Sequence, residues 1–370
     1  MRMPFLPAVT RRALSSVARE PVVVCGAGAV GVACAHYLAR DHGRDVVLVD
    51  ARPPLTYTSS RSTECYRNYW AGNAPMTAFM NRSIDLLEAR AAECDNAFSM
   101  SRRGYCFLSS TTEGSARHVQ AAQAVDRLGG GGGSVHVDGA HGLRYRADLP
   151  YDAAVDGVRV FSGRAAIDTF FGDLPPFLGP EVRSVLFSER CGWMNAQQMG
   201  TRLLEVARPA GVETLSPATV TGFEADDAGR LRAVKVQADG GERRLACSAF
   251  VNCAGPFAAA VHELLLKSGG GGGGGEFALP LRNEVHAKAV LRDERGAVPM
   301  SVPMMIWEDA VSLPWSAEDR DSLGALGGFE ASLAAPLPAG AHFRPYPGSP
   351  GSLLMLWESL HSGASRSRCT

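Results

Sequence analysis

A glycine turn near the start of the chain limits its possible folds more than any other feature. The stretch 22–31, VVVCGAGAVG, runs from a short apolar strand into the beginning of a helix. Gly26, Gly28 and Gly31 form the pattern G-x-G-x-x-G. Between a strand and a helix, such glycines permit a tight turn, close backbone approach of a pyrophosphate and close packing of the helix. The pattern predicts a dinucleotide site at the first turn of a parallel sheet.

A second strand and an acid complete this unit. Residues 45–50, DVVLVD, form an apolar strand that ends in Asp50. Asp50 lies about 20 residues beyond the glycines, the spacing at which a carboxylate accepts hydrogen bonds from a ribose diol. The free N–H groups at the N-terminus of the intervening helix would face the phosphates. The glycine pattern alone is a weak signal, but strand, helix, strand and acid in register indicate a nucleotide site.

Composition restricts the class of protein. Of the 370 residues, 46% are apolar and 20% are charged, and the formal net charge is −1. These values are typical of a globular enzyme and give no electrostatic basis for binding nucleic acid. No apolar run reaches the roughly 18 residues that a membrane span needs. The nine cysteines form no C-x-x-C pair, so neither a disulfide framework nor a zinc site is predicted. No Ser-His-Asp, Cys-His or metal-ligand pattern is apparent, which leaves hydrolase functions without support.

The first 20 residues differ in kind from the rest. They hold four arginines and no acid before Glu20, with apolar residues at helical spacing. Such a basic, amphipathic start predicts a transit peptide over residues 1–20. Its shortness favours the mitochondrion over the plastid. The alternatives are a solvated tail on a cytoplasmic protein, or a wrongly assigned start codon.

Periodicity outlines the elements that follow. Apolar residues at helical spacing predict helices over 76–94 and 195–210, and the second helix should end at Gly211. The segment 102–110 reads as a strand of a separate sheet, and 212–254 as three or four short strands joined by turns.

Three further segments carry no predicted element. The glycine tracts 129–133 and 269–275 lack the strand-to-helix context of a phosphate loop, which predicts flexible insertions in surface loops. Residues 361–370 are small and polar, and we expect them to form a disordered tail.

Two distant segments help to choose between FAD and NAD. Residues 51–70, ARPPLTYTSSRSTECYRNYW, stand where a nicotinamide enzyme would continue into its next helix and strand. Residues 251–265, VNCAGPFAAAVHELL, run from a strand through Ala-Gly-Pro into a helix. Together with 191–215, these segments resemble the FAD-dependent oxidoreductase family that includes D-amino acid oxidase, sarcosine oxidase and dimethylglycine dehydrogenase. The resemblance extends from about Val22 to about Trp357.

The resemblance implies where FAD would be held. The glycine turn would contact the pyrophosphate, Asp50 the adenosine ribose, and a Ser/Thr/Arg loop the pyrophosphate and flavin. The backbone of Val220 would contact adenine, and the strand returning at Ala254 would pass close to the cofactor. The implied cofactor-binding residues are Gly26, Gly28, Ala29, Val30, Gly31, Asp50, Ala51, Ser60, Arg61, Ser62, Thr63, Val220, Ala254 and Gly255. No counterpart of the flavin-linking histidine is found, so the resemblance implies non-covalent FAD.

The resemblance also suggests a reaction. Members of the family move a hydride from a carbon bearing an amine or hydroxyl to flavin, and their substrates include small amino acids, N-methyl amino acids and 2-hydroxy acids. Arg67 occupies the place of an arginine that binds the substrate carboxylate; a structural ion pair is the alternative. His286, beside Lys288 on an expected strand, is a candidate base, although most such histidines are structural. The electron acceptor stays open between O2, a quinone and an electron-transfer protein.

The expected architecture is α/β. A discontinuous Rossmann-like FAD-binding domain, residues 21–95 and 191–265, should be interleaved with an antiparallel-sheet substrate domain, residues 96–190 and 276–360. Family members continue past a segment like that ending at Glu358 into a glycine-rich closing block. The chain is therefore expected to be C-terminally truncated, which leaves its catalytic competence open. The alternatives are an organellar FAD-binding assembly or interaction factor without turnover, or a truncated inactive flavoprotein. An NAD-dependent dehydrogenase is disfavoured by TSSRST and VNCAGPF.

Overall fold

The chain forms two compact units, each assembled from two separate segments. The first unit combines residues 1–62 and 196–283, and the second combines 63–195 and 284–370. The computed structural model describes residues 20–127, 133–137, 142–268, 279–283 and 286–357. The expected tail at 361–370, nearly all of the expected transit peptide and most of both glycine tracts lie outside these ranges. The predicted interleaved α/β architecture is confirmed.

A four-stranded parallel sheet forms the centre of the first unit, with the strand order β13-β1-β2-β9. Its strands are β1 (Val22–Cys25), β2 (Val46–Val49), β9 (Val212–Leu215) and β13 (Ala249–Asn252). Val22 and Val24 face one side of the sheet, where α1 (Ala29–Arg40) and α5 (Ala196–Ala207) pack together. Alternate side chains thus bury both faces of β1, as a central parallel strand requires.

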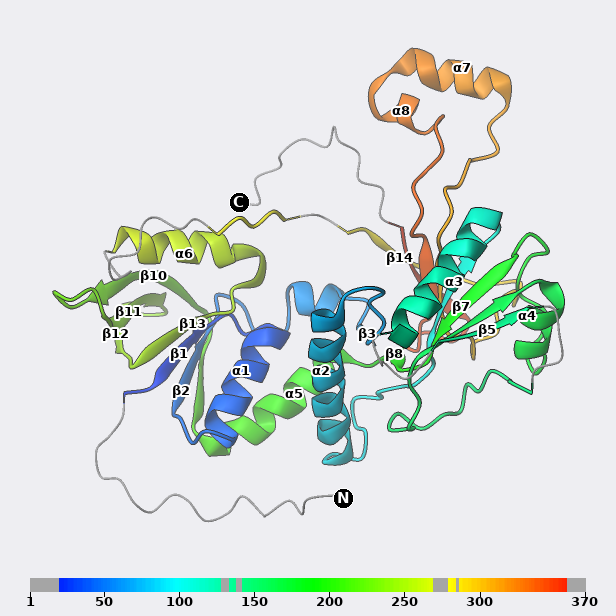
Figure 1. The fold of residues 1–370 in the computed structure, drawn as a ribbon. Helices are drawn as coiled ribbons and strands as arrows, with labels where there is room; N and C mark the ends of the chain where they lie inside the picture. Colours follow the sequence, from blue (N-terminus) through cyan, green and yellow to red (C-terminus); the bar gives the residue numbers. More distant parts are fainter. Residues whose placement is uncertain (1–19, 128–132, 138–141, 269–278, 284–285, 358–370) are drawn as a thin grey trace. The chain divides into compact units, whose positions relative to one another are not determined.

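The other face of this sheet is covered by a three-stranded antiparallel sheet and a helix. These are β10 (Ala218–Ala225), β11 (Leu231–Ala238), β12 (Gly241–Ala246) and α6 (Ala258–Lys267). Val23 packs into the cluster that they form. Figure 1 shows α6 in yellow-green beside β10. Three short 3₁₀ turns complete the described part of the unit: η1 (Thr58–Arg61), η2 (Arg208–Ala210) and η3 (Gly255–Phe257).

The second unit is built on an eight-stranded sheet with the order β14-β17-β16-β15-β4-β7-β6-β5. The strands are β4 (Tyr105–Ser109), β5 (Gly133–Val137), β6 (Val158–Ser162), β7 (Ser184–Ser188), β14 (Lys288–Arg292), β15 (Met304–Trp307), β16 (His342–Pro345) and β17 (Ser352–Leu356). Most neighbours pair antiparallel, as predicted, but β4 pairs with β15 and β5 with β6 in parallel. The sheet is therefore mixed.

Two helices pack on this sheet: α3 (Thr112–Arg127) and α4 (Arg164–Phe170). The other described helices of the unit are α2 (Ala74–Ala92), which contacts β3, and α7 (Ala317–Leu326) and α8 (Gly328–Ser332), which contact each other and project away from the sheet in Figure 1. Ala122 of α3 and Ile167 of α4 belong to two different hydrophobic clusters built on the sheet strands. Strand β3 (Cys65–Arg67) pairs antiparallel with β8 (Cys191–Trp193).

The predicted helices and the strand over 102–110 are present with small shifts of their ends, but residues 212–254, expected to form three or four strands, form five, β9 to β13. The helix expected over 76–94 is α2, the strand expected over 102–110 is β4, and α5 with η2 ends at Gly211, which has φ 114°. The unit boundary differs from the predicted domain boundary, because residues 63–95 lie in the second unit. The pairing of β3 with β8 holds this segment there.

The end of one glycine tract does not follow the expectation of a flexible insertion. Gly133 begins β5, and a β-carbon on it would lie 2.0 Å from the carbonyl oxygen of Ala122. The last glycine of this tract therefore permits close packing against α3.

Candidate functional site

A cavity of about 560 Å³ lies in the first unit at the glycine turn. Its walls come from segments 25–30, 49–59, 218–220 and 253–264. Most of the predicted cofactor-binding residues line it: Gly26, Gly28, Ala29, Val30, Asp50, Ala51, Val220, Ala254 and Gly255. The fold thus brings together residues from β1, β2, β10 and the turn after β13, as the dinucleotide hypothesis requires.

The glycines are required by sterics. Gly26 has φ 101°, and a β-carbon on it would lie 2.2 Å from the carbonyl oxygen of Cys253. A β-carbon on Gly31 would lie 1.7 Å from the carbonyl oxygen of Gly26. Gly31 does not line the cavity; it packs α1 onto the turn. Gly28 has no such backbone clash, so its small size leaves the backbone open to a ligand. This cradle fits a pyrophosphate.

Asp50 is held in place by two backbone donors. Its Oδ2 atom accepts a 2.6 Å hydrogen bond from the N–H of Ala27, and its Oδ1 atom accepts one of 2.8 Å from Arg52. A carboxylate offers about four lone-pair sites, so capacity for a ribose diol remains. Burial, assisted by the charge of Asp50, raises the pKa of Cys25 to about 12. The cavity therefore presents the Cys25 thiol in its neutral form.

The loop after β2 contributes a residue that the sequence did not single out. Ser59 lines the cavity, and its Oγ accepts a 2.9 Å hydrogen bond from the N–H of Ala29 in the first turn of α1. Its neighbour Ser60 instead donates to the carbonyl oxygens of Thr56 and Tyr57. The 3₁₀ turn η1 decides which hydroxyl faces the cavity, and the run of Ser and Thr residues gives no signal for that register.

The remaining residues of the predicted Ser/Thr/Arg loop lie elsewhere. Arg61 and Ser62 are exposed and, like Ser60, do not line the cavity. Thr63 belongs to the second unit, where the Nε atom of Arg344 donates a 3.0 Å hydrogen bond to its carbonyl oxygen. Arg344 also pairs with Glu64 across 3.3 Å. Thr63 is thereby anchored to β16.

A second cavity, of about 590 Å³, lies within the second unit. Its lining includes residues of β3 and, from the large sheet, residues of β4 and β15. Its lining is mostly apolar and aromatic: Thr63, Cys65, Tyr66, Arg67, Trp70, Met80, Tyr105, Phe107, Met304, Ile306, Pro338, Ala339, Gly340 and His342. This composition is typical of small-molecule sites, which combine apolar walls with a few polar groups.

Arg67 is the arginine of this cavity. Its guanidinium carbon lies 4.4 Å from the centre of the Trp70 ring, a cation–π contact. Within the described ranges no carboxylate pairs with Arg67, so the alternative of a structural ion pair gains no support. The indole Nε1 of Trp70 is also buried without a hydrogen-bond partner among these residues. The Arg67 guanidinium is thus a donor in the cavity of the kind that binds a carboxylate.

The phenol and thiol groups around this cavity stay protonated at neutral pH. Burial raises the pKa values of Tyr66, Tyr105 and Cys65. Tyr69 precedes the lining residue Trp70 in the chain. Burial and the charge of Glu308 raise the pKa of Tyr69 to about 12. These groups shape the cavity and do not serve as bases there.

The other candidate catalytic residue lines neither cavity. His286 is exposed, precedes the start of β14 by two residues and belongs to the lining of neither cavity. Lys288 is the first residue of that strand.

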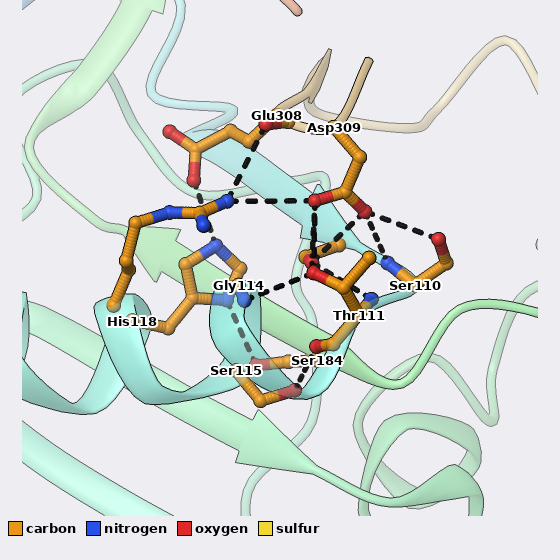
Figure 2. Close-up of polar contacts among 10 residues, drawn as sticks. Ser110, Thr111, Gly114, Ser115, His118, Ser184, Glu308 and Asp309 are labelled. Carbon is orange, nitrogen blue, oxygen red and sulfur yellow. Dashed lines mark hydrogen bonds and ion pairs between the residues drawn. The ribbon is translucent and has the colours of Figure 1, made fainter. Parts of the chain in front are cut away.

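A buried polar network brings together a serine, a histidine and a glutamate that the sequence pattern did not reveal (Figure 2). The Nδ1 atom of His118 lies 2.8 Å from Ser184 Oγ, and its Nε2 atom lies 2.9 Å from Glu308 Oε2. This order imitates a hydrolase triad, but Ser184 is 0% exposed and His118 is 1% exposed. Because no substrate can reach the hydroxyl, the arrangement does not change the expectation that the chain is not a hydrolase.

Asp309 forms the other half of this network. It accepts hydrogen bonds from the hydroxyls of Ser109 and Ser110 and a 2.6 Å bond from the N–H of Ser110 (Figure 2). Burial opposes its charge, but these hydrogen bonds, with one from Thr111, hold its pKa below the usual value. Asp309 thereby fastens the segment after β15 to the start of α3.

None of the helices in the described parts of the chain is both long and apolar enough to span a membrane. Nor do these residues include a group of three or more His, Cys, Asp or Glu side chains placed to hold a metal ion.

Several solved structures of similar fold are of enzymes named for their action on amino acids. L-proline dehydrogenase from P. horikoshii is 16% identical, with a TM-score of 0.61, and the match covers 94% of this chain and 72% of that one. Glycine oxidase from Bacillus cereus is 12% identical, with a TM-score of 0.59 and coverages of 93% and 73%. L-amino acid deaminase from Proteus vulgaris, lacking its specific insertion sequence, is 16% identical, with a TM-score of 0.58 and coverages of 95% and 71%.

Comparison at the level of sequence gives a family and no individual relative. No curated protein matches the chain significantly. Residues 21–271 match the model of the family described as FAD dependent oxidoreductase. This match spans more than half of the chain and includes every segment that lines the nucleotide cavity. The chain therefore belongs to the family of FAD-dependent oxidoreductases.

Proposed function

We propose that this flavoprotein oxidises a small carboxylate-bearing substrate: an amino acid, an N-methyl amino acid or a 2-hydroxy acid. The observation that carries this proposal is the Arg67 guanidinium, which lines an apolar cavity without an acidic partner among the described residues. Bound FAD would supply the chemistry by accepting a hydride from the substrate. The residues of the chain bind and orient the two molecules.

The first unit holds the cofactor in this proposal. The cradle at Gly26 and Gly28 admits the pyrophosphate, and the N–H groups of the first turn of α1 face it. Asp50 accepts from the adenosine ribose, and the backbone of Val220 meets the adenine. These contacts are non-covalent.

Arg67 selects the substrate. Its planar guanidinium offers two parallel N–H donors to a carboxylate, and Trp70 keeps that plane fixed by stacking. Tyr105 and Phe107 provide apolar wall, which excludes water from the bound substrate. The similar structures named for proline, glycine and L-amino acid enzymes support the choice of substrate class.

The experiment that tests this proposal is anaerobic titration of the purified, FAD-loaded protein with a panel of amino, N-methyl amino and hydroxy acids. Loss of the flavin absorbance near 450 nm with one compound class supports the proposal. A yellow protein that no candidate bleaches would contradict it and favour an FAD-binding interaction factor without turnover. A protein that binds NAD but not FAD would remove the cofactor assignment as well.

Reoxidation of the bleached protein identifies the electron acceptor. Oxygen, a soluble quinone and an electron-transfer flavoprotein are added in turn, and the rate of colour return is compared.

We further propose that residues 1–20 direct the protein to the mitochondrion. The arginine-rich, acid-poor start supports this proposal. A fluorescent protein fused after residue 20 should localise to mitochondria, and a fusion to the chain without these residues should not. Plastid or cytosolic fluorescence of the first fusion would contradict the proposal.

A further inference from the structure

Two cysteines meet beside the nucleotide cavity, which Cys253 lines. Cys34 lies on α1, and Cys253 lies in the turn that follows β13. Their Sγ atoms are 3.8 Å apart, although the residues are separated by 219 positions in the chain. The contact has a steric basis: a β-carbon on Gly31, one helical turn before Cys34, would lie 3.3 Å from the β-carbon of Cys253. The absence of a side chain at Gly31 lets Cys253 approach this face of the helix.

The two thiols have different chemical characters. The hydrogen bond from the Cys253 thiol lowers the pKa of Cys34, although burial opposes this shift. The same hydrogen bond, together with burial, raises the pKa of Cys253. Both side chains are half-buried, so neither is sealed from solvent. Cys34 is therefore the more readily ionised thiol and would act as the nucleophile, and Cys253 is the thiol that donates the hydrogen bond.

We propose that Cys34 and Cys253 form a redox-active dithiol that closes to a disulfide when the protein meets a peroxide. The proposal depends on the contact of the two sulfurs and does not depend on the substrate of the enzyme.

The reaction with hydrogen peroxide has two steps. The Cys34 thiolate attacks one peroxide oxygen, the O–O bond breaks, and with one proton the products are a Cys34 sulfenic acid and water. The Cys253 sulfur then attacks the Cys34 sulfur, the S–O bond breaks, and the Cys253 proton leaves with the hydroxyl as a second water. In total, two thiols lose two electrons and one peroxide gains them.

The link would have a consequence for the cavity. Cys253 supplies the carbonyl group that packs against Gly26, and α1 supplies the N-terminus that faces the ligand. A disulfide between Cys34 and Cys253 would fix these two walls to each other. We infer that nucleotide release is slower in the oxidised protein; this part rests on the proposed FAD site.

Mass spectrometry after peroxide treatment tests the dithiol. The expected result is a non-reduced peptide pair that joins Cys34 to Cys253, and its loss on adding dithiothreitol. In the variant Cys253→Ser, Cys34 should stop at the sulfenic acid and be trapped by dimedone. In Cys34→Ser, Cys253 should not react. Oxidation of Cys34 to sulfinic acid in the native chain without a linked pair would overturn the proposal.

Two physical measurements complete the test. The oxidised protein should melt about 5 °C higher than the reduced one, because the link closes a long loop in the unfolded chain. The variant Cys94→Ser, which alters another half-buried cysteine, should keep this difference, whereas Cys34→Ser should abolish it. After dilution, FAD release, followed by the rise in fluorescence of the free flavin, should be about tenfold slower in the oxidised protein, equivalent to about 1.4 kcal/mol in the barrier. Equal release rates with a confirmed link would overturn only the effect on the cofactor.

Discussion

The α-carbon of Gly26 faces the carbonyl oxygen of Cys253 so closely that a β-carbon would lie 2.2 Å from it. The two residues directly follow the neighbouring parallel strands β1 and β13. The turn that cradles the nucleotide is thus formed by both strands, and its shape depends on the absence of a side chain at Gly26.

Gly26→Ala should destabilise the protein and abolish FAD retention. The positive φ costs an alanine about 1–2 kcal/mol, and the clash with a backbone atom adds to that cost. Urea denaturation and the flavin content after gel filtration measure the two effects. Gly43→Ala is the matched control, because Gly43 has φ 58° and nothing within 4 Å of the β-carbon position. Equal losses of stability and flavin in both variants would show that the close contact of Gly26 with Cys253 is not needed for FAD retention.

Asp50→Ala should raise the Kd for FAD by about ten- to a hundredfold, as expected for lost hydrogen bonds to a charged group. Asp50→Asn retains one acceptor oxygen and should have a smaller effect. Fluorescence quenching of added FAD measures both. Asp45→Asn, at the other end of the same strand segment, is the control and should bind FAD like the native chain. An unchanged Kd in Asp50→Ala would contradict the ribose contact.

Arg67→Ala should raise the KM of a carboxylate substrate by about ten- to a hundredfold, because a charge-assisted pair is lost. Arg67→Lys should recover part of this loss, since it restores the charge but not the planar fork. Steady-state kinetics with an accepted substrate measure the change, and the exposed Arg146→Ala is the control. A decarboxylated amine analogue should respond little to these variants; an equal response would argue against carboxylate binding.

Asp309→Asn should lower the free energy of unfolding by about 2 kcal/mol at pH 7, since buried hydroxyl donors lose a charged acceptor. The pKa of Asp309 is lower in the folded than in the unfolded protein. Its stabilisation is therefore full above the unfolded pKa of about 3.9 and is lost as the pH falls through the folded value. The difference in stability between the two proteins should therefore begin to shrink as the pH falls below about 4. Asp148→Asn, at an exposed position, should show little change at any pH.

The glycine turn could be predicted from sequence because its chemistry is local. Strand, Gly26, Gly28 and the acid at Asp50 stand at fixed spacings, and each has a steric or hydrogen-bonding reason for its position. The same holds for Gly211, whose left-handed conformation ends α5 and η2.

The contacts that could not be predicted from sequence patterns depend on distant segments or on local register. Ser59 and Ser60 are adjacent serines, and only the 3₁₀ turn η1 determines which of the two hydroxyls reaches α1. His118 meets Glu308 across 190 positions of the chain, and no spacing rule links them. Cys34 and Cys253 are also brought together by the packing of α1 on the parallel sheet.

The pairing of β1 has a consequence for how the protein folds during its synthesis on the ribosome. Val22 pairs with Val46 on one side and with Ala249 on the other. The N-terminal βαβ segment leaves the exit tunnel early, but its central strand has an open edge until the chain has been translated past β13. Long-range pairing of this kind slows folding and exposes apolar edges. We expect the nascent chain to need chaperone protection over this interval, and the nucleotide cradle to form only after its last wall has been synthesised.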